Sequence, residues 1–153
     1  MPFSIRHTFP VPCSSQLYRF TEAHHFTKPN DHRGLELMDH AAICLMREFS
    51  DIVLGFGQSD EFRYVYLIRD TPIPQSSFVS FLLRKSAALY NRRRSKITSI
   101  LCSYFTASYV MNWVSYFPDT PLRFIPSFDA RVILYPGIPE VRDYFSWRQA
   151  DSV

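Results

Sequence analysis

Two short clusters of polar side chains in the chain could bind phosphate groups or a metal ion. Asp60 and Glu61 stand at a turn between two apolar runs, and carboxylates past the edge of a sheet can bind a hard cation. Arg93 and Lys96 lie three residues apart, so on a helix they share a face. A guanidinium fork beside an ammonium group suits a triphosphate. A plain polar turn and a solvated basic face are the alternatives.

A third cluster precedes a predicted helix. Lys28 and Asn30 stand just before it, and a lysine beside a helix N-terminus can bind an anion. Capping of the helix by Asn30 or Asp31 is the more common use of such residues. Histidines also concentrate in this region, at His24, His25, His32 and His40. Their spacing matches no familiar set of metal ligands, so we expect surface histidines.

The composition indicates one globular domain. The chain has 153 residues, of which 46% are hydrophobic and 16% aromatic, which excludes two independent domains and a disordered chain. The net charge is only +3, but positive side chains concentrate between Arg84 and Lys96, which suits a phosphate-rich partner. Three widely spaced cysteines indicate neither a disulfide framework nor a zinc site and favour a reducing compartment. The N-terminus lacks the apolar core of a signal peptide.

Hydrophobic periodicity predicts the elements that position these clusters. They are a helix at 31–49, a hairpin formed by 52–57 and 62–68, a loop at 69–78, a long helix from there to Phe117, a strand at 128–135 and a helix from Pro139. Residues 1–25 show no clear period. The order helix, hairpin, helix, strand predicts an α+β fold of the ferredoxin-like type, in which an antiparallel sheet carries both helices on one face. Only the initial strand of that arrangement is lacking.

The segment Ile97–Phe117 raises the question of a membrane span. It has no formal charge and follows the basic stretch, in the order that the positive-inside rule favours. A third of its residues are polar, however, so a buried helix is expected instead.

Five motifs stand in the chain in a fixed order. They are His25–Asp31 (HFTKPND), Asp51–Phe62 (DIV followed by GQSDEF), Arg92–Lys96 (RRRSK), Phe128–Val132 (FDARV) and Tyr144–Asp151 (YFSWRQAD). Together they resemble the tRNA-histidine guanylyltransferase family over about residues 19–151. The resemblance implies a palm like that of nucleotide polymerases, in which two Mg²⁺ ions held by carboxylates position a triphosphate. It also implies addition of a guanylate from GTP to the 5′ end of histidine tRNA after activation by ATP.

Carried over by position, the resemblance assigns roles to residues of all three clusters. Asp60 would be a magnesium ligand and Glu61 its acidic neighbour in catalysis. Contacts to nucleotide or phosphate are implied for Ser59, Lys28, Asn30, Asp31, Arg93 and Lys96. The family resemblance favours a homotetramer, and the expected location is intracellular, either cytoplasmic or nuclear.

The chain departs from the family at its first motif. Cys13-Ser14-Ser15-Gln16-Leu17-Tyr18 replaces a metal-binding Asp-Gly-Arg-x-Phe-His, so half of the expected metal site is absent. We therefore expect an irregular, divergent N-terminus at 1–18 and a palm-like domain at 19–151 with an insertion around 69–91. A palm that is incomplete at both ends is expected to bind GTP weakly and to transfer no guanylate.

Two other functions remain open. A noncatalytic tRNA-binding or assembly subunit would keep the fold without the chemistry, and Mg²⁺-dependent GTP binding separates it from the enzyme. A membrane-anchored protein would use Ile97–Phe117, and pelleting with membranes in carbonate would reveal it; no membrane is expected among the partners.

Overall fold

The protein combines helices with one sheet whose strands do not follow their order in the chain, and this is an α+β fold. The computed structural model describes residues 3–8, 20–28, 31–58, 63–67, 78–83 and 86–150. In chain order the elements are β1 (Phe3–Thr8), α2 (His32–Glu48), β2 (Ile52–Gln58), β3 (Arg63–Leu67), β4 (Phe78–Leu83), the 3₁₀ helix η1 (Leu89–Arg92), α3 (Arg94–Tyr116), β5 (Asp129–Leu134) and α4 (Ile138–Ala150).

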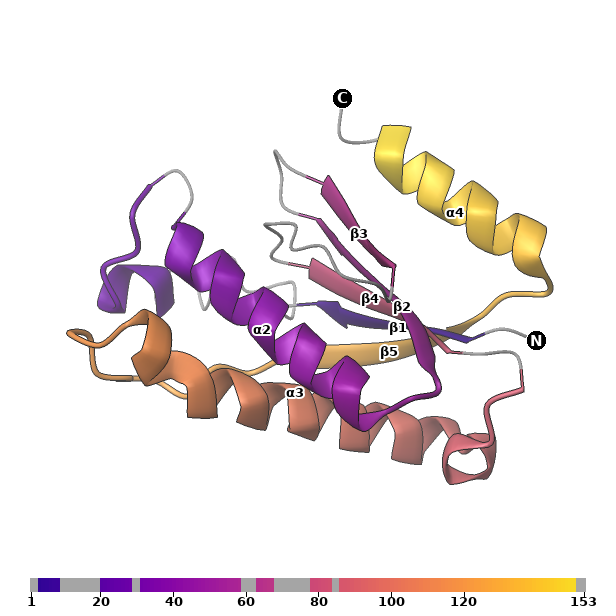
Figure 1. Ribbon diagram of the computed structural model, residues 1–153, viewed down its shortest axis with the longest axis horizontal. Helices are drawn as coiled ribbons and strands as arrows, with labels where there is room; N and C mark the ends of the chain where they lie inside the picture. The colour runs from indigo at the N-terminus through magenta and orange to yellow at the C-terminus, as the bar shows by residue number, and fades with distance from the viewer. Residues whose placement is uncertain are drawn as a thin grey trace.

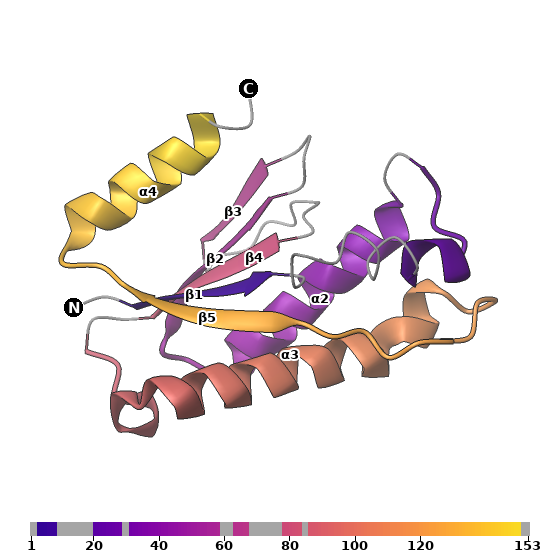
Figure 2. The same cartoon turned by 180° about the vertical axis from the view of Figure 1, so that it is seen from behind.

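The five strands form one antiparallel sheet in the order β3-β2-β4-β1-β5 (Figures 1 and 2). Phe81 in β4 lies opposite Gly55 of β2 on one side and Ile5 of β1 on the other. Ile5 in turn lies opposite Val132 of β5. Consecutive strands are therefore neighbours only in the β2–β3 hairpin, and the inner strands come from distant parts of the chain.

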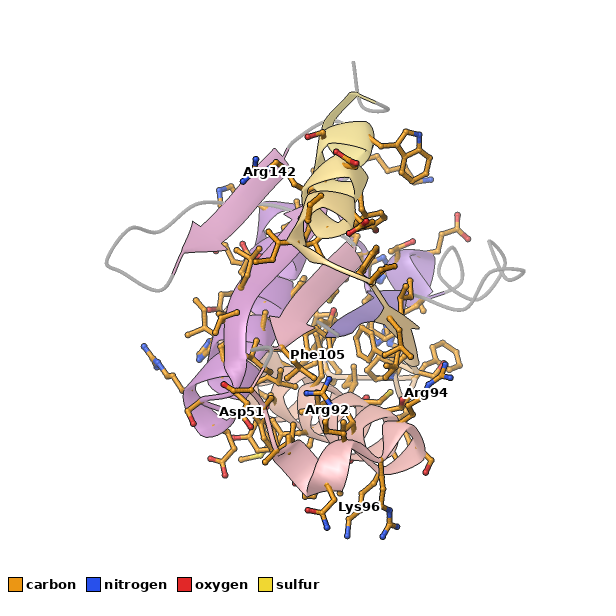
Figure 3. The ribbon with its side chains drawn as sticks, turned by 90° about the vertical axis from the view of Figure 1, so that its right-hand side faces the viewer. Asp51, Arg92, Arg94, Lys96, Phe105 and Arg142 are labelled. Atoms are coloured by element: carbon orange, nitrogen blue, oxygen red, sulfur yellow. The ribbon has the colours of Figure 1, made fainter. Side chains whose placement is uncertain are left out.

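Helices α2 and α3 lie side by side along one face of the sheet and run in opposite directions (Figures 1 and 2). Two ring contacts show this orientation, because Phe49 at the end of α2 packs against Tyr104 in the middle of α3, while His40 in the middle of α2 packs against Tyr116 at the end of α3. Buried residues recur every four positions on α3, at Ile97, Leu101, Phe105, Tyr109 and Trp113. This spacing keeps one helical stripe facing the interior. Helix α4 lies on the other side of the sheet from α3 (Figure 3).

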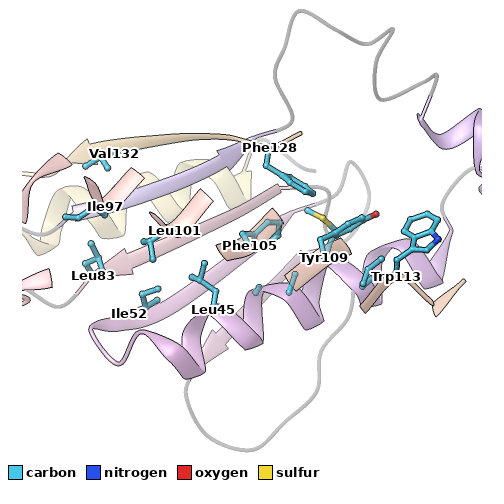
Figure 4. Close-up of a cluster of buried hydrophobic side chains, with 14 of the residues drawn as sticks. Leu45, Ile52, Leu83, Ile97, Leu101, Phe105, Tyr109, Trp113, Phe128 and Val132 are labelled. Carbon is cyan, nitrogen blue, oxygen red and sulfur yellow. The ribbon is translucent and has the colours of Figure 1, made fainter. Parts of the chain in front are cut away.

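The hydrophobic core lies between this helix pair and the sheet (Figure 4). Leu37 and Leu45 of α2, Ile52 of β2 and Leu83 of β4 are each at most 1% exposed. Side chains of this size contribute about 1.5–3 kcal/mol each when they are removed from water. The core therefore ties α2 and α3 to the central strands.

Most of the predicted elements are confirmed. The helix expected at 31–49 is α2, the hairpin is β2–β3, and the strand expected at 128–135 is β5. The buried helix expected over Ile97–Phe117 is also confirmed as part of α3. Within the described residues, none of the helices has the length and the apolar character needed to cross a membrane.

The structure also contains two strands that the sequence reading did not predict. β1 lies within 1–18, where irregular structure was expected, and that prediction is wrong for Phe3–Thr8. β4 lies within the expected surface insertion at 69–91, and there it pairs with both β1 and β2. A strand in the middle of a sheet tends to be a continuous apolar run, which periodicity does not separate from a buried helix. Consequently the second long helix begins at Arg94, after β4 and η1.

Candidate nucleotide-binding site

The predicted metal ligand Asp60 and its acidic neighbour Glu61 belong to the connection between β2 and β3. The two strands pair as far as Gln58 and Arg63, so the hairpin that was expected to present the carboxylates is in place. Ser59, Asp60 and Glu61 themselves lie outside the described residues. Among the residues that are described, no three histidine, cysteine, aspartate or glutamate side chains are grouped closely enough to hold a metal ion.

Asp31 is the N-cap of α2, as one of the two sequence alternatives proposed. Its carboxylate accepts hydrogen bonds from the backbone N–H of Thr27 at 2.9 Å and of Arg33 at 3.0 Å. The Arg33 guanidinium donates two more, from Nε to Oδ1 at 3.0 Å and from Nη2 to Oδ2 at 2.7 Å. Burial alone would raise the pKa of Asp31, but these hydrogen bonds outweigh it and hold the pKa below its usual value. The carboxylate therefore stays ionised and joins Thr27, in the segment before the helix, to Arg33 in the first turn of α2.

Lys28 lies in this same segment with an exposed side chain, and Asn30 lies outside the described residues. Aromatic packing docks the segment onto the end of α3. The Phe26 ring stacks on Phe117, with centroids 5.0 Å apart. Gly34 leaves room for it, because a Cβ there would meet Phe26 Cε2 at 2.5 Å. The position of Lys28 thus depends on contacts with the C-terminal end of α3.

The basic cluster, Arg92–Arg94 with Lys96, surrounds the start of α3. Arg93 is its N-cap residue, no side chain caps the helix, and no acidic residue stands in the first turn. The Arg94 Nη2 donates to the Val132 carbonyl at 3.3 Å, while Arg93 and Lys96 are exposed. Free N–H groups and positive side chains at a helix start favour anions. Figure 3 looks at this end of the molecule, where Asp51 is also found.

An unusual backbone turn leads into this cluster. Tyr90, Asn91 and Arg92 have φ values of 49°, 53° and 56°, all in the left-handed region. Each such residue other than glycine costs about 1–2 kcal/mol, with asparagine at the lower end. Two contacts support the turn: Arg92 Nη1 donates to the Ala87 carbonyl at 3.1 Å, and Lys96 Nζ lies 5.4 Å from the Tyr90 ring centroid. Backbone strain of this kind often accompanies functional sites.

The structure does not bring all predicted site residues together. Because α2 and α3 are antiparallel, Asp31 and Arg33 lie at the end of α3 where Phe117 follows it. Lys96 is in the first turn of α3. A helix rises about 1.5 Å per residue, so about 30 Å separates the two ends. Within one copy, the Lys28–Asp31 segment and the basic cluster are therefore separate sites.

The sequence reading missed two residues that organise the first of these sites. Arg33 was not considered, and its ion pair with Asp31 joins residues only two positions apart, a spacing at which side chains on a helix do not normally face each other. The expectation of surface histidines is wrong for His24, which is 0% exposed. His25 and His32 are exposed as predicted, and His40 is half-buried. His24 is enclosed by the rings of Phe20, Trp113 and Phe124 and accepts the backbone N–H of Arg123, and contacts so distant in sequence leave no local pattern.

Comparisons with known proteins bear on this arrangement. A model of the family described as tRNAHis guanylyltransferase matches residues 14–136. The chain is 44% identical over 135 residues to a probable tRNA(His) guanylyltransferase of Dictyostelium discoideum, covering 88% of this chain and 46% of the relative. It is 46% identical over 134 residues to the tRNA(His) guanylyltransferase of Schizosaccharomyces pombe, covering 88% of this chain and 44% of the relative.

Solved structures share the fold. The tRNA(His) guanylyltransferase of Saccharomyces cerevisiae superposes with a TM-score of 0.77 at 31% identity, covering 98% of this chain and 57% of that one. A bacterial tRNA(His) guanylyltransferase-like protein, solved in complex with ATP, superposes with a TM-score of 0.72 at 24% identity over 99% of this chain and 57% of that one. The second likeness concerns the fold alone.

These solved structures thus share the α+β fold of this chain. The family model covers well over half of the residues, and the chain belongs to the tRNAHis guanylyltransferase family. It spans less than half the length of the two curated relatives named above.

Proposed function

We propose that the chain is a nucleotidyltransferase module that acts in adding a guanylate from GTP to the 5′ end of histidine tRNA after activation by ATP. The match of the family model over residues 14–136 carries this proposal. The exposed basic start of α3 supports it, since a triphosphate needs several positive groups in one place. A polymerase-like palm, a homotetramer and a cytoplasmic or nuclear location belong to the same proposal.

In this proposal Asp60 is a magnesium ligand with Glu61 beside it in the β2–β3 connection. Carboxylate oxygens are the ligands that Mg²⁺ prefers, and substrate phosphates complete its coordination in enzymes of this chemistry. When bound, two such ions would stabilise the charge that develops on the attacking and leaving oxygens. Ser59 contacts the nucleotide from the same connection.

The two positively charged sites then have different tasks. Arg93 and Lys96 hold a triphosphate at the start of α3, where both side chains are exposed. Lys28, Asn30 and Asp31 contact a nucleotide at the opposite end of the helix pair. The length of α3 excludes one nucleotide held by both groups of the same copy.

Transfer of labelled GMP to 5′-phosphorylated histidine tRNA tests the proposal. The chain as it stands should bind GTP weakly in the presence of Mg²⁺ and transfer no measurable guanylate, because Cys13-Ser14-Ser15 cannot replace a metal-binding carboxylate. A triple variant, Cys13→Asp with Ser14→Gly and Ser15→Arg, should tighten Mg²⁺-dependent GTP binding. Adding Asp60→Ala to this variant should remove the gain. Absence of GTP binding in every variant would contradict the proposal.

The replaced motif also favours a second candidate, a noncatalytic tRNA-binding or assembly subunit. Such a subunit would bind histidine tRNA equally well with and without Mg²⁺ and GTP. Its tRNA affinity would be unchanged by Asp60→Ala. Robust guanylate transfer by the unaltered chain would exclude it and would show that another residue replaces the missing ligand.

A further inference from the structure

We propose that His24, in its neutral form, is a positioning residue that fastens its own segment, which ends at Thr27 and Lys28, to the loop after α3, and that protonation of His24 releases this segment. The inference deepens the proposed function, because Lys28 is a proposed nucleotide contact and Thr27 bonds to Asp31, which is another. His24 itself contacts neither of the proposed phosphate sites.

The hydrogen bonds of His24 join two parts of the chain that are distant in sequence. Its Nδ1 lies 2.7 Å from the carbonyl oxygen of Phe20. Its Nε2 accepts the backbone N–H of Arg123 at 2.9 Å. The Phe20 carbonyl can only accept and the Arg123 amide can only donate, so the proton must sit on Nδ1. Only this neutral tautomer satisfies both partners at once.

Burial makes these two hydrogen bonds sensitive to a charge on the His24 ring. The ring is 0% exposed and is enclosed by Phe20, Trp113 and Phe124, with centroids at 4.2, 4.9 and 6.2 Å. A second proton on Nε2 would point at the Arg123 N–H, which is another donor. The charged or titratable groups facing His24 are Arg123 from the loop and His25 from its own segment, while α3 presents the uncharged Trp113.

These surroundings favour the neutral form. Burial is the largest cause, and together with the positive charges of Arg123 and His25 it outweighs the hydrogen bond to Phe20 and lowers the pKa of His24. The stability that the neutral ring contributes is therefore present above the usual value of 6.5 and is lost as the pH falls through the lower pKa of the folded state.

A short chain of contacts connects His24 to the proposed nucleotide contacts. The turn that holds it continues directly into Phe26, whose N–H donates to the Thr21 carbonyl at 3.0 Å. Thr27 N–H then donates to the Asp31 carboxylate. A displaced His24 would carry this turn with it and withdraw Thr27 from Asp31. Lys28 would then lose its fixed position.

Trp113 offers a direct optical readout, since a protonated imidazole close to an indole quenches its fluorescence. The chain has two tryptophans, so Trp147→Phe leaves Trp113 as the single probe. Its fluorescence should titrate with a midpoint below the usual histidine value of about 6.5. His24→Gln should abolish this titration, because the glutamine amide can donate to Phe20 and accept from Arg123 without gaining a charge. His25→Gln, the exposed neighbour, is the matched control. It should keep the titration, with a midpoint at least as high as in the unaltered chain, because it removes only the smallest of the causes that lower the pKa of His24.

Amide hydrogen exchange tests the positioning role. Protection factors of the Arg123 and Thr27 amides, which correct for the intrinsic effect of pH, should fall together by about fivefold or more near pH 5, as expected for one lost hydrogen bond. They should not fall in His24→Gln. A pH transition that persists in His24→Gln would overturn the proposal. Loss of protection at Arg123 alone, with Thr27 unaffected, would overturn it as well.

A binding measurement separates this inference from the proposed function. The ratio of GTP affinities of the unaltered chain and His24→Gln should be close to one near pH 7.5 and should favour His24→Gln near pH 5. An unchanged ratio would show that the segment does not serve the nucleotide. Absence of GTP binding even near neutral pH would reject the proposed function, while the exchange measurement would still decide the role of His24.

Discussion

The guanidinium carbon of Arg33 lies 4.6 Å from the centroid of the Phe117 ring, so the first turn of α2 is fastened to the residue that follows α3. The same guanidinium makes a bidentate ion pair with the capping residue Asp31. Phe117 in turn stacks on Trp113 with centroids 4.2 Å apart. A cap, an ion pair and an aromatic stack therefore form one unit where the two helices meet.

Asp31→Asn should lower the free energy of unfolding by about 1–3 kcal/mol, because it removes the charge that Arg33 and two backbone amides bind. Glu36→Gln is the matched control, since Glu36 pairs with the exposed His32; it should cost less than about 0.5 kcal/mol. Urea unfolding at neutral pH measures both. Equal effects of the two substitutions would contradict the structural role of Asp31.

The same carboxylate predicts a pH dependence. The pKa of Asp31 is held below its ordinary value of 3.8, so its contribution to stability is complete above that value and is lost as the pH falls through the lower pKa of the folded state. Between about pH 5 and pH 2, the free energy of unfolding should therefore change less with pH in Asp31→Asn than in the unaltered chain. Unfolding curves recorded at each pH measure it.

Asn91→Gly should stabilise the protein, because glycine adopts the left-handed conformation of residue 91 without steric cost. The expected gain is about 0.5–1 kcal/mol. Asn112→Gly makes the same substitution inside α3, where it should destabilise, because glycine has the lower helix propensity and the hydrogen bond from Asn112 Nδ2 to the Ser108 carbonyl is lost. If thermal unfolding shows that Asn91→Gly raises the melting temperature and Asn112→Gly lowers it, the left-handed turn is supported. Changes in the same direction would contradict it.

Leu83→Ala should cost about 2–5 kcal/mol, because Leu83 is 1% exposed in the central strand β4. Leu134→Ala, at a position that is 42% exposed in the edge strand β5, should cost less than about 1 kcal/mol. Deletion of 78–83 should abolish cooperative unfolding. A deletion variant that still unfolds cooperatively would show that this region is a surface insertion.

Lys96→Ala should weaken Mg²⁺-dependent GTP binding by about tenfold or more, the usual effect of losing a charge-assisted contact. Arg47→Ala removes an equally exposed positive charge from the last turn of α2 and should leave the affinity unchanged. Fluorescence anisotropy of a labelled GTP measures both. If Lys96→Ala weakens only the binding of tRNA, the basic cluster serves the RNA backbone instead.

Local sequence patterns predicted the elements whose own residues show a clear pattern. Apolar positions that recur at three and four located α2, and the uncharged but one-third polar run Ile97–Phe117 located the core-facing part of α3. β-Branched and aromatic residues located the β2–β3 hairpin. β4 was missed because Phe78–Leu83 is almost wholly apolar, and only its two partner strands distinguish it from a helix. β1 does alternate, with Phe3, Ile5 and His7 at every second position, but it is short and prolines flank it.

The candidate site was predictable in its residue types but not in its geometry. Asp31 was recognised both as a possible cap and as a nucleotide contact, and its cap contacts with Thr27 and Arg33 are local. The bond between His24 and Arg123 spans most of the chain, so no spacing rule applies to it. The separation of Lys28 from Lys96 follows from antiparallel packing of two helices, which their individual sequences do not specify.

The order of the strands has a consequence for the newly made chain. β1 is synthesised before both of its partners, β4 and β5, and Ile5 can meet Val132 only when the chain has been made as far as β5. Ribosomes add about 5–20 residues per second, so this segment waits roughly ten seconds with unpaired backbone groups. Meanwhile α2 and the β2–β3 hairpin can form from neighbouring residues. Sheets built from such distant pairings fold slowly and expose strand edges to other chains. β1 is thus the strand that waits longest for its partners and most needs protection from aggregation.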